Sequence, residues 1–406
     1  MSRGINNFQT GRLAQILAAR RLSQAQLAMM VGVSPPTISK WNSGLQAPSA
    51  EALDRLASVV NVSAEWFTRP LLPKMSKPLF RSNASAHVAA RAMLAARMEW
   101  VDEIVTRLSE FVDFPELKLP VRNFKSLDEI SREDIESAAN ECRKLWGLGN
   151  RAIPDLALAA EGNGIVLVRE ETGTAEIEGL SGWSSVLPDR PFILLSADKG
   201  NGFRSRFDLA HEIGHLILHK GMEPSLDAVK YKQKEDQAHL FAGAFLMPAE
   251  FFAEEIRTPV TLDSLLLVKQ RYGVSVAAII MRLYALGIIG DDEKQLLYKR
   301  RSARWGVKAE PGDDTRKPEQ PRLLKRTLEL LISHGVMTMD GVSGFIGLST
   351  VDIEMLSGLP TGYLSGQSAD VVQMSRLKDM REQQEPQEHS PDSFKTGDVI
   401  SFSRSK

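Results

Sequence analysis

Hydrophobic positions follow different spacings in successive parts of the chain. From about residue 8 to residue 68, short apolar runs recur at helical spacing, starting with Leu13, Ile16 and Leu17. Between Gly164 and Ser196 the period changes to that of strands, and helical spacing returns after it. The pattern predicts a multidomain chain with an all-α N-terminal bundle, an α+β domain and a mainly helical C-terminal region.

Turn and cap residues divide the N-terminal bundle into short helices. Ser23 precedes a helical run from Gln24 to Val31, and Gly32 begins a tight turn. We expect Ser34 to cap a third helix, which ends before Gly44. Further helical turns are expected at Ala50–Val60 and Ala64–Phe67. Two short helices joined by a tight turn are typical of domains that place the second helix in the major groove of DNA.

Three motifs of this bundle resemble the DNA-binding domain of phage repressors, the XRE type. They are Ser23-Gln-x-Gln-Leu-Ala, Gly32-Val-Ser and Ile38-Ser-x-Trp-x-x-Gly44. The resemblance implies that the third helix contacts base edges and that the start of the second contacts phosphate. The candidate DNA-binding residues are Gln24, Pro35, Pro36, Thr37, Ser39, Lys40 and Asn42. A bundle that makes only protein contacts is the alternative.

Two features bear on how this bundle would bind DNA. Pro35 and Pro36 stand where related repressors often carry amides, and proline cannot donate a hydrogen bond to a base. Sequence readout would therefore be weaker, or depend on thymine methyl groups and DNA shape. A modest excess of basic residues favours phosphate contact. Arg12, Arg20, Arg21, Lys40 and Arg55 outnumber Glu51, Asp54 and Glu65.

The strongest sign of chemistry is His211-Glu-Ile-Gly-His215 within an apolar helical run. Residues four apart lie on one face of a helix, so the imidazoles of His211 and His215 can share a metal ion. Glu212 can then reach a water at the metal and act as general base. His219 would stand about 12 Å along the helix axis from His211, too far to share one tetrahedral ion. We expect it to be a histidine near the last carbonyls of the helix.

A third ligand is expected on a second helix, in the segment Glu235–Pro248, and Glu235 is the candidate. Together, Arg206–His215 and Glu235–Pro248 resemble the ImmA/IrrE family of zinc endopeptidases. The resemblance implies a zincin-like fold, a Zn²⁺ ion held by His211, His215 and Glu235, and Glu212 as the catalytic base. His239 stands where the family usually has Asn, one turn from Glu235. It could orient a ligand, bind a tetrahedral intermediate, or fill the open metal position and silence the site.

Two further features belong to this expected domain. Asp208, three residues before His211, is a candidate to orient a ligand imidazole. Strands at Ile165–Val168, Ile177–Trp183 and Phe192–Ser196 would form a small antiparallel sheet over the metal helix. An edge of such a sheet can hold an extended peptide by main-chain pairing, so we expect the peptide groove there.

Proline-rich and helical segments surround these domains. Three prolines in Arg69–Pro78 indicate a linker, and amphipathic helices are expected from Ala84 to about Phe111 and from Arg132 to Leu145. Their apolar stripes indicate core packing or a homodimer contact. The expected domains are residues 1–69 (helix-turn-helix), 70–148 (linker and helical connector), 149–290 (peptidase-like), 291–380 (helical, role unknown) and 381–406 (disordered tail). Helices are also expected at Thr261–Tyr272, Val276–Leu286 and Leu323–His334, and the basic run Lys299–Arg304 indicates a solvated surface.

Composition excludes only a few classes of function and location. The 406 residues are 43% hydrophobic and 25% charged, with a net charge of −1, so any attraction to nucleic acid must be local. A single cysteine, Cys142, excludes an internal disulfide and fits a reducing compartment. The N-terminus has no apolar signal region, and no apolar run reaches the ~18 residues of a membrane span. We expect a cytoplasmic protein without a membrane partner.

Together these features predict a DNA-binding regulator with a zinc-dependent endopeptidase domain. Its partners would be double-stranded DNA and a protein substrate, either a repressor or the chain itself. Self-cleavage would nick the chain near Arg69–Pro78. The alternative is a repressor-like or antitoxin-like regulator whose metal ion is structural or sensory.

Overall fold

The structure is a computed structural model that describes residues 4–75, 79–80, 88–173, 177–187, 189–198, 200–222 and 227–366, with only the backbone at 79–80. All the elements below belong to one unit that ends at Gln367. The tail expected at 381–406 lies outside the described residues, as do residues 76–78 of the expected linker.

The N-terminal bundle has the helices that its turn residues predict. They are α1 (Thr10–Ala19), α2 (Gln24–Val31), α3 (Pro35–Asn42), α4 (Ala50–Val60) and the 3₁₀ helix η1 (Ala64–Thr68). Ser23 and Gln26 form a capping box at the start of α2, and Gly32 ends that helix in the left-handed conformation. Ser34 stands at the N-cap of α3 but makes no cap hydrogen bond, because its hydroxyl lies 2.9 Å from that of Thr37.

The sheet is mixed, not antiparallel as expected. Its strands are β1 (Leu79–Phe80), β2 (Val166–Glu170), β3 (Gly179–Trp183) and β4 (Pro191–Ser196), in the order β1-β3-β4-β2. β3 and β4 are antiparallel neighbours, but β2 lies on the other edge of β4 and runs parallel to it. Hydrophobic alternation predicts that a segment is a strand, but it does not say which edges pair, and this is why the prediction is wrong.

Alternation along the strands gives the sheet two buried faces. Val166 and Val168 of β2 join one core, whereas Leu167 between them joins the other. β4 divides in the same way, with Phe192 and Leu194 facing the first core. The first core also holds the helix-turn-helix bundle and the C-terminal helices, and the second holds the helices of the predicted metal site. The sheet is therefore shared by both cores.

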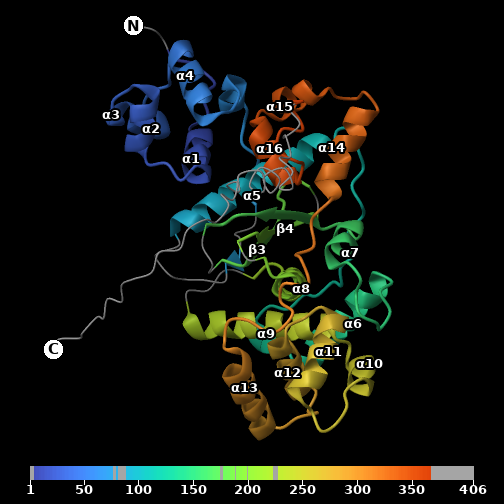
Figure 1. Cartoon of the computed structure of the whole chain (residues 1–406). Helices are drawn as coiled ribbons and strands as arrows, with labels where there is room; N and C mark the ends of the chain where they lie inside the picture. The colour runs from blue at the N-terminus through green and yellow to red at the C-terminus, as the bar shows by residue number, and fades with distance from the viewer. Residues whose placement is uncertain are drawn as a thin grey trace, which may run out of the picture. The chain divides into compact units, whose positions relative to one another are not determined.

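Helices cover both faces of this sheet (Figure 1). α8 (Gly202–Leu218) and α9 (Ala228–Leu246) belong to the second core, and α5 (Val88–Leu108) belongs to the first. The other helices are η3 (Leu127–Glu129), α6 (Arg132–Leu145), α7 (Leu156–Gly162), α10 (Ala249–Glu254), α11 (Leu262–Tyr272), α12 (Val276–Ala285), α13 (Asp291–Trp305), α14 (Leu323–Ser333), α15 (Met339–Ile346) and α16 (Thr350–Ser357). Within the described ranges no single helix is long and apolar enough to cross a membrane, although α11 and α12, bent by 99°, would pass that test as a pair.

The N-terminal bundle is anchored to α5 by a buried ion pair. Arg12 makes two hydrogen bonds to the carboxylate of Glu103, at 2.5 and 2.9 Å, and it also donates to the carbonyl of Pro70. The guanidinium carbon of Arg12 lies 4.5 Å from the ring centroid of Trp66. The apolar residues of α5 are buried in the first core, so core packing is the one of the two alternatives left open by its sequence that this chain shows.

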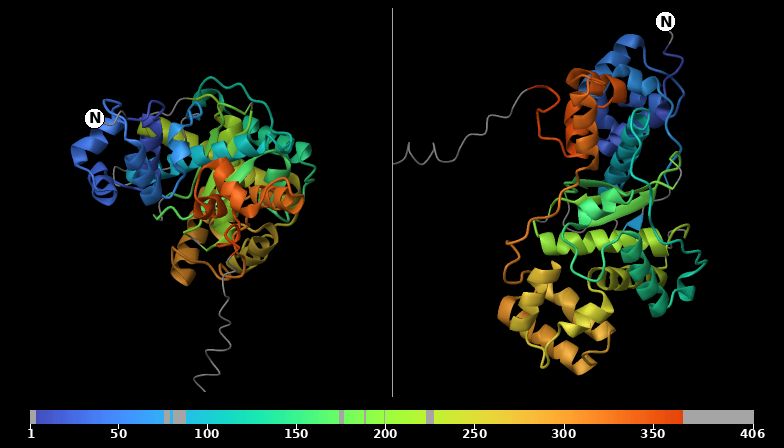
Figure 2. Two further views of the ribbon diagram at one scale, coloured as in Figure 1. Left: turned by 90° about the horizontal axis from the view of Figure 1, so that it is seen from above. Right: turned by 90° about the vertical axis from the view of Figure 1, so that its right-hand side faces the viewer.

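The C-terminal helices also pack against the N-terminal bundle, as two further views show (Figure 2). Arg20 pairs with Asp352 of α16, and Arg69 donates to carbonyl groups at the end of α15. The backbone N–H of Ser63 donates to the carbonyl of Gly347. Residues 323–366, for which the sequence indicates no role, thus complete the core that holds the N-terminal bundle.

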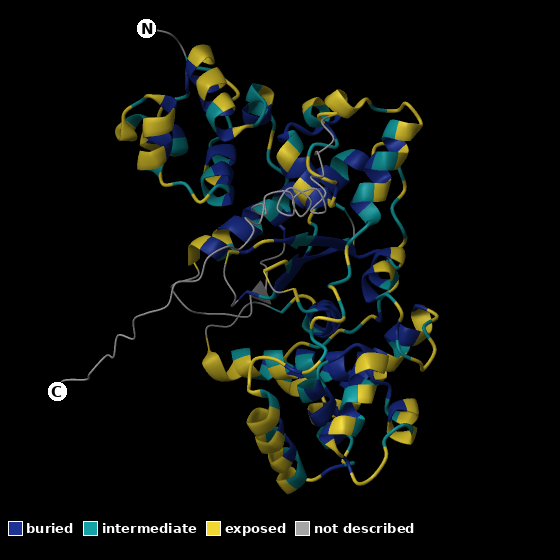
Figure 3. Cartoon of the chain, in the orientation of Figure 1, coloured by how far each residue is buried: buried dark blue, intermediate teal, exposed yellow. Residues whose placement is uncertain are grey.

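The expected basic surface at Lys299–Arg304 is only partly solvated. It lies on α13, whose outer face is exposed (Figure 3). Arg301 is buried and donates to Glu310 at 2.8 Å. Glu310 also accepts hydrogen bonds from Lys269 and from the N-terminal amides of α12. Because the acidic partner comes from the following loop, the basic run by itself could not reveal this ion pair.

Candidate metal centre and nucleic-acid interface

Helix α8 carries three histidines on one face. Asn201 caps its first turn, and the helix is buried along nearly all of its length. His211, His215 and His219 follow one another at four-residue intervals and point towards α9. Gly214 allows this close approach, because a Cβ atom there would stand 3.0 Å from the ring of Phe241 on α9. Gly214, inside the His-Glu-x-x-His motif, therefore indicates that another helix packs closely here. The spacing of the histidines does not indicate this.

The three predicted ligands meet between α8 and α9. The Nε2 atoms of His211 and His215 lie 3.0 Å apart. The carboxylate oxygens of Glu235 lie 3.3 Å from His211 Nε2 and 3.4 Å from His215 Nε2. Tetrahedral ligands at zinc–ligand distances of roughly 2.0–2.1 Å are separated by about 3.3 Å. The residues present therefore fit a Zn²⁺ ion.

Burial sets the protonation of this cluster. Burial lowers the pKa of His215, while the nearby carboxylate of Glu235 opposes the shift. Burial raises the pKa of Glu235, but the neighbouring side chains of His211 and His215 outweigh it and hold that pKa far below its ordinary value. Neutral imidazole and ionised carboxylate are the forms that bind a metal ion.

His219 stands at the helix end, as expected, where it is the C-cap residue of α8. Its side chain is buried, and its Nδ1 lies 2.9 Å from Nδ1 of His215. Its Nε2 lies 3.0 Å from Oε1 of Gln237, on α9. Burial lowers the pKa of His219 well below its ordinary value, and the neighbouring His215 adds to the shift. His219 therefore lies behind a predicted ligand, not at the metal position.

Glu212, the predicted general base, lies under strand β3. The hydroxyl of Ser181 donates to Glu212 Oε2 at 2.7 Å. The Oε1 atom packs against Gly179, where an added Cβ would stand 3.2 Å away. One oxygen is thus held by a hydrogen bond while the other is confined by packing. Ser181 carries no signal in the sequence, because its contact joins two elements far apart in the chain.

His239 stands between the ligand cluster and a cavity of about 720 Å³. Its Nδ1 lies 2.7 Å from the carbonyl oxygen of Glu235, which can only accept, so the ring's other nitrogen is its candidate ligand atom. Ligand atoms of His211, Glu235 and His239 all lie within 4.8 Å of one another. Asp208 lines the same cavity. The roles predicted for His239 and Asp208 stay predictions.

The predicted DNA-reading face offers few cations. On α3, Pro35, Pro36, Ser39 and Lys40 are exposed, whereas Thr37 and Asn42 are half-buried, as is Gln24 on α2. The arginines expected to favour phosphate contact are largely engaged within the chain. Arg12 binds Glu103, Arg20 binds Asp352, Arg21 donates to the carbonyl of Thr172, and Arg55 pairs with Glu51.

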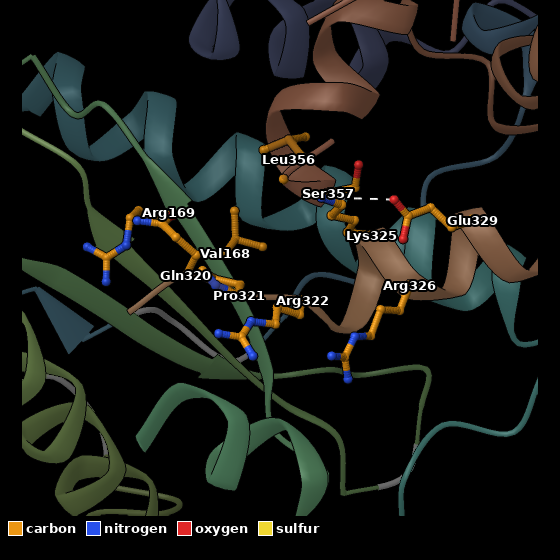
Figure 4. Close-up of a pocket in the computed structure, with 11 residues that line it drawn as sticks. Val168, Arg169, Gln320, Pro321, Arg322, Lys325, Arg326, Glu329, Leu356 and Ser357 are labelled. Carbon is orange, nitrogen blue, oxygen red and sulfur yellow. Dashed lines mark ion pairs between the residues drawn. The ribbon is translucent and has the colours of Figure 1, made fainter. Parts of the chain in front are cut away.

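A second cavity, of about 440 Å³, lies against β2, α14 and the end of α16 (Figure 4). Four cationic residues line it: Arg169, Arg322, Lys325 and Arg326. Arg169 and Arg326 stand at opposite ends of the group drawn, and their guanidinium groups do not meet (Figure 4). Arg169 donates to Ser205, and Arg322 pairs with Asp155. This cavity is separate from the candidate metal centre.

Comparison with known families matches two separate segments of the chain. A helix-turn-helix model matches residues 13–67, and the model of the IrrE N-terminal-like domain, peptidase M78, matches residues 160–284. The chain therefore contains both of these domains, joined in this order. No curated protein matches it significantly.

The IrrE-like domain contains His211, Glu212, His215 and Glu235, as well as His239. The XRE-type helix-turn-helix domain contains all the predicted DNA-binding residues. Both matches lie inside the domain ranges expected from the sequence, and both support the multidomain fold. They identify a domain of a metallopeptidase family joined to a DNA-binding domain.

Proposed function

We propose that this chain is a DNA-binding regulator whose IrrE-like domain is a zinc-dependent endopeptidase. It would act in the cytoplasm and change DNA occupancy by cleaving a repressor partner or itself. One observation carries the proposal. Donor atoms of His211, His215 and Glu235 lie 3.0 to 3.4 Å apart, and the carboxylate of Glu212 follows His211 on the same helix.

The mechanism assigns a task to each residue. When bound, Zn²⁺ would polarise the scissile carbonyl and acidify the attacking water. Glu212 would accept the proton from that water and donate it to the leaving amine. Ser181, through its 2.7 Å hydrogen bond, would hold Glu212 in the position from which both transfers are made. The cavity of about 720 Å³ beside His239 would receive side chains of the substrate.

Backbone pairing at the sheet edge favours the chain itself as one substrate. An extended peptide is expected to pair with an edge strand, and β3 is the strand above Glu212. The outer edge of β3 is paired antiparallel with Leu79 and Phe80 of the same chain, opposite Ser181 and Leu180. These residues directly follow Arg69–Pro78, where we expect self-cleavage.

Metal content and cleavage test the proposal together. Purified wild type should bind one zinc ion per chain, and His215→Ala should lose it. Zinc-loaded wild type, but not Glu212→Gln, should cleave a candidate repressor or cleave itself into two fragments, with the cut near Arg69–Pro78. Intact mass and N-terminal sequencing locate the cut. A chain that binds no zinc, or identical products from wild type and Glu212→Gln, would contradict the proposal.

The second candidate is a regulator whose metal ion is structural or sensory. It is favoured by the position of His239, whose ligand atom lies within 4.8 Å of those of His211 and Glu235. If an imidazole occupied the fourth coordination position of a tetrahedral zinc ion, no position would remain for the catalytic water. His239→Asn separates the two functions. Cleavage that appears only in this variant indicates a silenced site, whereas cleavage by wild type excludes silencing.

A further inference from the structure

Behind the ligand His215, a chain of polar side chains connects helix α8 to α9 and to η3. It consists of His215, His219 and Gln237, and it ends at the backbone carbonyls of Leu127 and Ile130. His219 and Gln237 are both buried. Because each contact in the chain needs one donor and one acceptor, the positions of the protons can be worked out from its outer end.

The amide of Gln237 has one orientation that satisfies its neighbours. The Nε2 group lies 2.8 Å from the carbonyl oxygen of Leu127 and 3.5 Å from that of Ile130. Carbonyl oxygens only accept hydrogen bonds, so the amide NH₂ must face them. The amide oxygen therefore faces His219, whose Nε2 lies 3.0 Å away. Since that oxygen accepts, His219 must carry a proton on Nε2.

The proton on Nε2 of His219 determines the remaining proton positions in this hydrogen-bond chain. A neutral imidazole carries a single N–H, so Nδ1 of His219 presents a lone pair. That lone pair lies 2.9 Å from Nδ1 of His215, which must then be the donor. The lone pair of His215 is consequently on Nε2, the atom that lies 3.0 Å from His211 Nε2 and 3.4 Å from Glu235. This is the tautomer that a metal ligand requires.

We propose that His219 and Gln237 form a relay that fixes the metal-binding tautomer and ring orientation of His215, which makes His219 a positioning residue. The opposite proton arrangement would put N–H on His215 Nε2 and block coordination. Carboxylates and carbonyls usually orient metal-binding histidines from behind, and their removal typically weakens metal binding by roughly 10- to 100-fold. Here the imidazole of His219 orients His215. Gln237 keeps the proton of His219 on Nε2, so that Nδ1 can accept. The inference rests on the proposed metal site.

The relay can be read directly in the metal-free protein. The full chain is labelled with ¹⁵N on its seven histidines, and His215 and His219 are assigned by single His→Gln variants. Long-range ¹H–¹⁵N spectra distinguish protonated from unprotonated ring nitrogens. We expect His215 to be protonated on Nδ1 and His219 on Nε2. Protonation of His215 on Nε2, or of His219 on Nδ1, in the wild-type protein would overturn the relay.

Zinc affinity provides the second measurement. In His219→Asn the amide oxygen can replace Nδ1 as acceptor, whereas His219→Leu keeps bulk but has no acceptor. We expect the Leu variant to bind zinc about 10- to 100-fold more weakly than wild type and the Asn variant to recover most of that loss. His334→Leu, which removes an exposed histidine on the C-terminal side of α14, is the matched control. Equal zinc affinity in wild type and His219→Leu would refute the relay.

The two measurements separate this inference from the proposed function. If His219→Leu does not fold, the wild-type spectra still decide the proton positions. If wild type binds no zinc while the spectra show the expected tautomers, the relay exists and the proposed function fails. If wild type binds zinc and cleaves its substrate while His215 is protonated on Nε2 in the apo protein, the proposed function stands and the relay fails.

Discussion

The salt dependence of DNA binding tests how many basic residues of the N-terminal bundle contact phosphate. Each phosphate that a protein neutralises contributes about −0.9 to the slope of log K against log salt concentration. Of the five basic residues expected to favour phosphate contact, Arg12 is buried against Glu103, and Arg20 and Arg21 are bound to residues outside the bundle. Lys40 is exposed on α3, and Arg55 is in an exposed pair with Glu51. One or two contacts per chain predict a slope of about −1 to −2.

The assay is fluorescence anisotropy with a labelled random-sequence duplex, titrated at several salt concentrations. We expect Lys40→Gln to reduce the magnitude of the slope by about 0.9. Arg20→Gln removes the same charge from the same domain but should leave the slope unchanged, because Asp352 already holds that guanidinium. A slope steeper than about −4 per chain, or equal effects of the two variants, would refute this assignment of the cations.

Three further predictions concern stability and the proposed catalytic base. Glu103→Ala leaves Arg12 buried without its carboxylate and should cost about 3–5 kcal/mol of unfolding free energy in denaturant titration. Glu65→Ala, which removes an exposed carboxylate paired with Arg69, should cost less than about 1 kcal/mol. Similar losses in the two variants would contradict the anchoring role of Arg12. Burial raises the pKa of Glu161 to about 7, against hydrogen bonds from the amides of Leu323 and Arg322. A raised pKa means that the folded state holds this proton more tightly, so the stability contributed is complete below about pH 4.5 and is lost as pH rises through about 7. Glu161→Gln should therefore flatten the melting temperature across this window, and an unchanged pH profile would show that Glu161 does not control it. Gly179→Ala would place a Cβ 3.2 Å from Glu212 Oε1, so cleavage should slow by about tenfold or more with zinc content unchanged; full activity in this variant would show that the packing of Glu212 is not critical.

The sequence is enough to predict both domains and to place two candidate metal ligands on one helix face, because these features depend on local periodicity. Residues four apart on a helix share a face wherever the helix lies, so the pairing of His211 with His215 follows from their spacing alone. Glu235 is supported by the family resemblance, and its place beside the two histidines is consistent with that resemblance. Capping and turn residues likewise predict α2, α3 and their connection.

Contacts between distant segments are decided only by the tertiary structure. Ser181 reaches Glu212 because β3 lies over α8, and Gln237 reaches His219 because α9 lies beside it. The arginines of the first domain have the charge of phosphate ligands, but in the folded chain Glu103 and Asp352 bind two of them. The sequence determines a side chain's charge and hydrogen-bonding capacity. Long-range packing determines its partner, and the partner determines what the side chain can do.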